Sequence, residues 1–129
     1  MADLRLTVSD GSREIDLRAD WTDDAPETRE ALAAALPVES TASRWGDELY
    51  FSISVDAAPE NARAAVDVGT VAYWPQGNAL CLFWGPTPAS TGEEPRAASP
   101  VNVVARVRDV SALAAIEDGA HVRVEAVRD

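Results

Sequence analysis

The sequence predicts a mainly β domain that folds as a small antiparallel or mixed barrel. Apolar and polar residues alternate over much of the chain, as they do in half-buried strands. Turn residues separate these segments, giving roughly eight strands and two helices. There is no internal repeat and no regular alternation of strand and helix. A barrel is a common architecture for this pattern because closing a sheet removes its exposed edges.

A central hairpin is predicted within the weakly charged stretch Gly69–Ser90. Two strands flank the turn Pro75–Asn78, in which Gly77 can adopt the left-handed conformation that closes such loops. The second strand, Ala79–Trp84, is an unbroken apolar run, which indicates that both of its faces are covered. Pro86 and the proline two residues later end it, because proline lacks the backbone donor that a strand needs.

The N-terminal part predicts a hairpin followed by the main helix. Leu4–Val8 and Glu14–Arg18 alternate in the manner of paired strands. A helix begins near Pro26, which is tolerated in a first turn, and continues to Leu36 with its apolar residues on one side. Pro37 ends it.

Further strands are expected on either side of the central hairpin. Val38–Ser43 and Leu49–Val55 precede it, separated by a turn, and Asp56–Asp67 is expected to be a loop.

After the central hairpin the chain contains polar and apolar segments in turn. Thr91–Ser99 is rich in proline, glycine and glutamate and is expected to be a mobile loop. Val101–Arg108 alternates as a strand, Ser111 can cap a short helix, and Val122–Ala126 forms the last strand.

The composition indicates one acidic domain over residues 1–129. The formal net charge is −11, and all eleven basic residues are arginine. This pattern is typical of halophilic proteins, which work in a cytoplasm of molar salt that screens the repulsion between their acidic groups. The alternative is an acidic protein from a GC-rich mesophile, whose codons also favour arginine over lysine. The charge disfavours nucleic acid and anionic membranes as partners. The N-terminus has no secretion signal and no apolar run spans a membrane, so we expect a cytoplasmic protein.

Common catalytic and metal-binding patterns are missing from the sequence. The single histidine, His121, has no second histidine or cysteine with which to share a metal, so no metal or cofactor is expected. Cys81 lies in the apolar run and is expected to be a small core residue. The carboxylate pairs Asp23–Asp24 and Glu93–Glu94 fall in predicted loops and are expected to be solvated.

Aromatic residues are the remaining candidates for a binding site. Most should belong to the core, because alternation directs about half of them inward. Tyr50 and Trp74 are out of phase with the core-facing residues of their strands, so each needs a covering element or a ligand.

Four segments resemble the cyclophilin-like family of small bacterial and archaeal proteins. They are Arg44–Phe51 (RWGDELYF), Gly69–Pro75 (GTVAYWP), Ala79–Pro88 (ALCLFWGPTP) and Ser99–Val103 (SPVNV). The resemblance follows nearly the whole chain in order. It implies a closed eight-stranded barrel with one main helix and one or two short helical segments, like a reduced cyclophilin.

The resemblance also implies a binding site. Cyclophilins are peptidyl-prolyl isomerases in which an arginine weakens the resonance of the prolyl amide inside an aromatic pocket. Arg44 is the candidate for that catalytic arginine, although the sequence contains no F-H-R-type cyclophilin motif. The expected ligand-binding residues are Trp45, Tyr50, Trp74, Phe83 and Asn102.

Three functions remain open from the sequence. The first is a module that binds peptides or proline, with weak or absent isomerase activity. The second is a small-molecule-binding domain of metabolic context, supported by analogy of fold. The third is a protein-interaction module, monomeric or homodimeric, that uses exposed aromatic residues such as Trp21 and Trp74.

Overall fold

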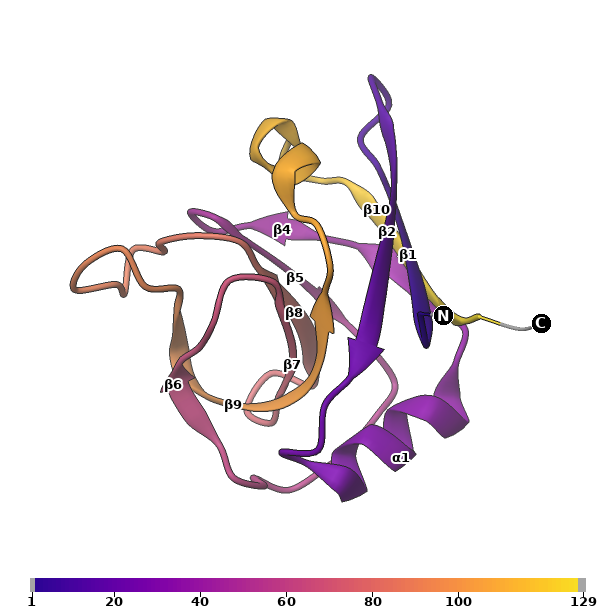
Figure 1. Ribbon diagram of the computed structural model, residues 1–129, viewed down its shortest axis with the longest axis vertical. Helices are drawn as coiled ribbons and strands as arrows, with labels where there is room; N and C mark the ends of the chain where they lie inside the picture. The colour runs from indigo at the N-terminus through magenta and orange to yellow at the C-terminus, as the bar shows by residue number, and fades with distance from the viewer. Residues whose placement is uncertain (1, 128–129) are drawn as a thin grey trace.

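The computed structural model describes residues 2–127 and contains ten strands, one α-helix and one 3₁₀ helix (Figure 1). In chain order the elements are β1 (Leu4–Ser9), β2 (Glu14–Trp21), α1 (Pro26–Ala35), β3 (Val38–Thr41), β4 (Ser43–Arg44), β5 (Glu48–Ser52), β6 (Arg63–Ala65), β7 (Thr70–Trp74), β8 (Ala79–Phe83), β9 (Arg96–Val107), η1 (Ser111–Ala115) and β10 (His121–Ala126). The predicted mainly β fold with one main helix is confirmed.

The strands form one antiparallel sheet with the order β3-β10-β1-β2-β9-β7-β8-β5-β4, and β6 pairs with β9 beside this path. The prediction of a closed, eight-stranded barrel is not confirmed. Among the described residues the strands number ten, and the end strands β3 and β4 share no ladder. The reason lies at Ala42, where the chain changes partner: β3 pairs with β10, whereas β4 pairs with β5. The two ends of the strand order are thus consecutive in the chain.

The main core lies on the inner face of the curved sheet. It contains Leu4, Leu6 and Val8 of β1 and the inward residues of the other long strands. Leu32 of α1 and Leu113 of η1 also belong to it. Figure 1 shows α1 and η1 at opposite ends of the sheet. The inner face is therefore packed along its length by alternating strand residues and capped by helical ones.

A second, smaller core lies on the outer face of β7 and β8. Its buried members are Val66, Ala72, Cys81, Phe83, Ala97, Val101 and Val103. All five residues of β8 are buried, which confirms the prediction that this apolar run is covered on both faces. The cover on the outer face is the first half of β9, which bends away from the sheet and pairs with β6 (Figure 1).

Several element boundaries differ from those that the sequence predicts. β9 begins at Arg96, within the segment expected to be a loop, and β6 lies within Asp56–Asp67. The reason is that these two short segments pair with each other, a long-range contact that local alternation does not reveal. β5 ends at Ser52 instead of Val55.

The turn of the central hairpin also differs in detail. Asn78, not Gly77, has a positive φ, of 47°. Gly77 is required for another reason: a Cβ there would lie 2.4 Å from the Trp74 ring. This glycine therefore allows the Trp74 ring to pack directly on the turn.

Candidate functional site

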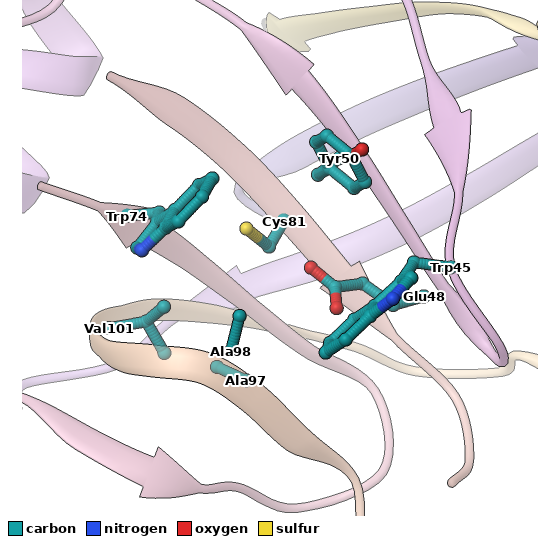
Figure 2. A pocket seen from close by; sticks show the side chains of 8 residues that line it. All are labelled: Trp45, Glu48, Tyr50, Trp74, Cys81, Ala97, Ala98 and Val101. Carbon is teal, nitrogen blue, oxygen red and sulfur yellow. The ribbon is translucent and has the colours of Figure 1, made fainter. Parts of the chain in front are cut away.

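A cavity of about 270 Å³ lies between the outer face of β5, β8 and β7 and the first half of β9. Figure 2 shows its lining: Trp45, Glu48, Tyr50, Trp74, Cys81, Ala97, Ala98 and Val101. Most of the lining is apolar, and three aromatic rings contribute to it. A pocket of this kind, with few polar groups, is typical of small-molecule sites.

Strand alternation places the polar and aromatic lining residues on one face. Glu48 pairs with Phe83 and Tyr50 with Cys81 in the ladder between β5 and β8. Side chains two residues apart on a strand share a face, so Glu48, Tyr50 and Cys81 are all directed outward from the main core. Leu49, between them, is fully buried in that core.

The Trp74 ring is held in place by three contacts. It packs on Gly77, its Nε1 donates a hydrogen bond to Ser99 Oγ, and Tyr50 meets it edge-on. The ring centroids of Tyr50 and Trp74 lie 6.4 Å apart with an interplanar angle of 81°, a favoured aromatic geometry. This aromatic wall is therefore formed before any ligand binds.

Among the described residues that line the cavity, Glu48 is the only acidic or basic one. Glu48 is only 4% exposed, and its Oε1 has no hydrogen-bond partner. Burial raises the pKa of this carboxyl to about 7, and the Cys81 thiol lowers the pKa in part by hydrogen bonding. Figure 2 shows the carboxyl group directed into the cavity, between Cys81 and Trp45.

Cys81 is a buried free cysteine, as expected, and it also lines the cavity. Burial, followed by the neighbouring Glu48 charge, raises the pKa of its thiol well above the ordinary value. The thiol therefore stays protonated at neutral pH, which makes it a poor nucleophile.

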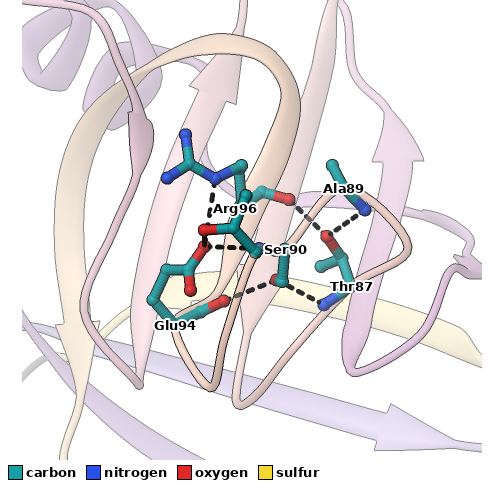
Figure 3. A network of polar contacts seen from close by, with 6 residues as sticks. Thr87, Ala89, Ser90, Glu94 and Arg96 are labelled. Atoms are coloured by element: carbon teal, nitrogen blue, oxygen red, sulfur yellow. Dashed lines mark hydrogen bonds and ion pairs between the residues drawn. The ribbon is translucent and has the colours of Figure 1, made fainter.

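A network of hydrogen bonds supports the cavity wall formed by the start of β9 (Figure 3). Thr87 Oγ1 donates to the Arg96 carbonyl, and Ser90 Oγ donates to the Glu94 carbonyl. The Glu94 carboxylate accepts from the Thr91 amide and from Arg96 Nε. These hydrogen bonds and this ion pair hold the pKa of Glu94 at about 2. The loop expected to be mobile is thus extensively hydrogen-bonded.

Arg44 does not line this cavity. Its Nη1 donates to the carbonyls of Ala114 and Ile116, at 3.2 and 2.6 Å, and its Nη2 contacts Asp47 Oδ1 at 3.1 Å. Its guanidinium lies 5.2 Å from the centre of the Trp84 ring. The side chain thus joins η1 to the β4–β5 turn, and this placement does not support the expected contact with a bound amide.

Asn102 and Phe83 also lie outside the cavity lining, whereas Trp45, Tyr50 and Trp74 belong to it. Asn102 is fully buried and donates to Thr28 Oγ1 and to the Ala58 carbonyl, both at 3.0 Å. It thereby ties β9 to α1. Phe83 is fully buried in the second core.

Sequence reasoning missed Glu48 and the small residues of β9. Glu48 is in phase with Tyr50, so its place on the same outer face was available from alternation alone. Its burial was not available, because the cover is formed by β9, a segment distant in sequence.

Neither a metal-binding cluster nor a membrane-spanning helix is present among the described residues. Within residues 2–127, no group of three or more His, Cys, Asp or Glu side chains is arranged to hold a metal ion. The described helices include none with the length and apolar character needed to cross a bilayer.

Comparisons with known proteins agree with this fold. The family model described as cyclophilin-like matches residues 3–125. The chain is similar to the hypothetical protein AF2241 of Archaeoglobus fulgidus, whose solution structure has 42% sequence identity and a TM-score of 0.71. That match covers 98% of this chain and 96% of AF2241.

A second solved structure, that of McbB in complex with tryptophan, has the same fold. Its sequence identity is 21% and its TM-score 0.67, over 96% of this chain and 46% of McbB. No curated protein matches the chain. The family model covers almost all of the sequence and agrees with the observed strand pattern, so the chain belongs to the cyclophilin-like family.

Proposed function

We propose that this protein is a binding module that takes a small, largely apolar ligand into the cavity between β5, β8 and the first half of β9. The observation that carries this proposal is the cavity itself, preformed and walled by Trp45, Tyr50 and Trp74. Aromatic rings with a single buried polar group favour a ligand that has an apolar body and one polar end.

The same cavity argues against prolyl isomerisation of the cyclophilin type. That mechanism needs a donor at the prolyl amide, and the described cavity lining contains no arginine. Arg44 Nη1 instead donates to the carbonyls of Ala114, in η1, and of Ile116, just after it. We therefore assign no isomerase role to Arg44.

A proline-containing peptide segment is the second candidate ligand. The observation in its favour is the aromatic wall, since a pyrrolidine ring packs well on indole and phenol faces. In this case the protein binds the peptide without accelerating cis–trans exchange.

The first experiment is an NMR titration with 2-phenylethanol, a neutral apolar probe, in potassium chloride at a fixed concentration. We expect the indole N–H signals of Trp45 and Trp74 to shift together. Ala98→Leu, which adds bulk to an exposed residue at the cavity wall, should weaken binding by about 10-fold. Ala34→Leu makes the same change on an exposed part of α1 and should have no effect.

Two outcomes would contradict the proposal. One is the absence of any shift at the cavity residues, and the other is an equal effect of Ala98→Leu and Ala34→Leu. An X-Pro peptide in the same assay separates the two candidate ligands. Peptide shifts without faster exchange favour peptide binding, whereas acceleration of exchange would overturn the assignment of a non-catalytic module.

A further inference from the structure

We infer that the ligand of this cavity carries a cationic amine and that the Glu48 carboxylate is the group that binds it. This inference rests on the proposed function and specifies its ligand class. It assigns to Glu48 a positioning and recognition role that none of the predicted site residues has.

The first argument is the unsatisfied carboxyl oxygen. Among residues 2–127, three buried side-chain atoms lack a hydrogen-bond partner: Thr22 Oγ1, Trp84 Nε1 and Glu48 Oε1. Of their residues, only Glu48 lines the cavity. A buried polar atom without a partner costs free energy, so a carboxyl directed into a preformed cavity is suited to a donor supplied by a ligand.

The second argument is the charge of the cavity lining. Its other described members are aromatic, alanine, valine and cysteine residues, so an anionic ligand would meet no arginine and one acidic group. An ammonium group would meet a carboxylate and three aromatic rings. Both kinds of group attract cations, and both attractions are stronger in a site from which water is excluded.

The groups around Glu48 do not offer it another counter-charge. Across the ladder from β5 lie Phe83 and Cys81 of β8, and Tyr50 follows on β5 itself. β7 contributes Trp74 to the cavity, and β9 contributes Ala97, Ala98 and Val101. The ionisable groups facing this carboxyl are thus a thiol and a phenol, neither of which is a cation. At low salt, where screening is weak, the formal net charge of −11 adds a long-range attraction for cationic ligands.

This arrangement makes binding depend on pH in a defined direction. A primary amine remains protonated up to about pH 10, whereas the Glu48 pKa is about 7 in the free protein. The carboxylate form grows as pH rises through 7, so affinity for the amine rises with it. A neutral ligand of the same shape lacks this dependence, because it gains little from ionisation of the carboxyl.

The experiment compares two matched pairs of probes by calorimetry and by NMR. The pairs are 2-phenylethylamine with 2-phenylethanol, and isopentylamine with isopentyl alcohol. In each pair the amine should bind at least about 10-fold more tightly than the alcohol at pH 8.5, and should lose about 10-fold or more by pH 5.5.

Two variants complete the design. Glu48→Gln keeps the shape of the side chain and should weaken amine binding by about 10- to 100-fold while changing alcohol binding by less than about threefold. Glu14→Gln removes the same charge from an exposed residue of β2 and should leave all four affinities unchanged. A retained NMR spectrum and unfolding temperature establish that Glu48→Gln is folded.

Each outcome decides between the hypotheses. Preference for the amines that Glu48→Gln abolishes supports the inference. Equal binding of amines and alcohols at the cavity overturns the inference and leaves the proposed function standing. Equal weakening by Glu48→Gln and Glu14→Gln overturns it as well, since only overall charge would then matter. Absence of all four probes from the cavity overturns both proposals.

Discussion

The two faces of the β5–β8–β7 region differ in how completely they are filled. On the inner face, the side chains of Leu80, Leu82 and Val71 are at most 1% exposed and belong to one large core. On the outer face the same three strands leave a cavity, although Cys81 is buried there as well. The inner face is therefore close-packed, whereas the outer face is only partly filled by protein side chains.

The two faces differ equally in how their polar groups are satisfied. On the inner side, the Tyr73 hydroxyl donates to the Val55 carbonyl at 2.7 Å and accepts from Asn78 Nδ2 at 2.9 Å. On the outer side, Glu48 Oε1 has no partner. A buried oxygen without a partner gains more from a ligand that donates a hydrogen bond than a buried hydroxyl that is already satisfied. Glu48 Oε1 is therefore the polar group at which a bound molecule would stabilise the protein most.

The largest expected effect comes from shortening neighbouring residues that lie on opposite faces. Leu82→Ala should lower the free energy of unfolding by about 2 to 5 kcal/mol, because it opens a new cavity in a close-packed core. Cys81→Ala, one residue earlier and beside an existing cavity, should cost about 1 kcal/mol or less. Urea unfolding at one fixed salt concentration measures both. Equal losses would mean that the outer face is packed as tightly as the inner one.

The next effect concerns the pH dependence of stability at Glu48. Its pKa is raised from 4.5 to about 7 by burial, so between these values the folded state binds a proton that the unfolded state releases. The stability that the folded state gains from binding this proton is fully present below pH 4.5 and is lost as pH rises through 7. The loss amounts to about 3 kcal/mol at most.

The measurement for this prediction is the free energy of unfolding at pH 5 and at pH 8. Wild type should lose more stability over that interval than Glu48→Gln, which has no proton to release. Glu14→Gln should follow wild type. A wild-type profile parallel to that of Glu48→Gln would show that the carboxyl is better solvated than its 4% exposure indicates.

The smallest of the three effects tests the separation of Arg44 from the cavity. Arg44→Ala removes hydrogen bonds to two carbonyls of the η1 region and should lower stability by about 1 to 3 kcal/mol. Arg44→Lys should recover only part of this, because lysine lacks the planar fork of donors. Affinity for 2-phenylethanol should stay within about twofold of wild type. A loss of affinity of about tenfold at unchanged stability would return Arg44 to the binding site.

Much of the fold follows from local patterns in the sequence. Alternation predicts β1, β2 and the two strands of the central hairpin, and Pro26 and Pro37 bracket the main helix. These features depend on residues a few positions apart, which is the range over which alternation and proline geometry act. Alternation makes Tyr50 and Trp74 candidates for the outer side for the same reason, and both line the cavity.

The sequence by itself determined most of the long strands, the main helix and the outward direction of Tyr50 and Trp74. Only the tertiary structure decided that Arg44 donates to a carbonyl at the end of η1, that Asn102 donates to Thr28 of α1, and that Glu48 is buried. The physical reason is that these roles depend on contacts between distant segments. From its place in the sequence alone, Glu48 is expected to be a solvent-exposed acid. It is buried because the first half of β9, which pairs with β6, covers the outer face of β8 and shields the carboxyl from water.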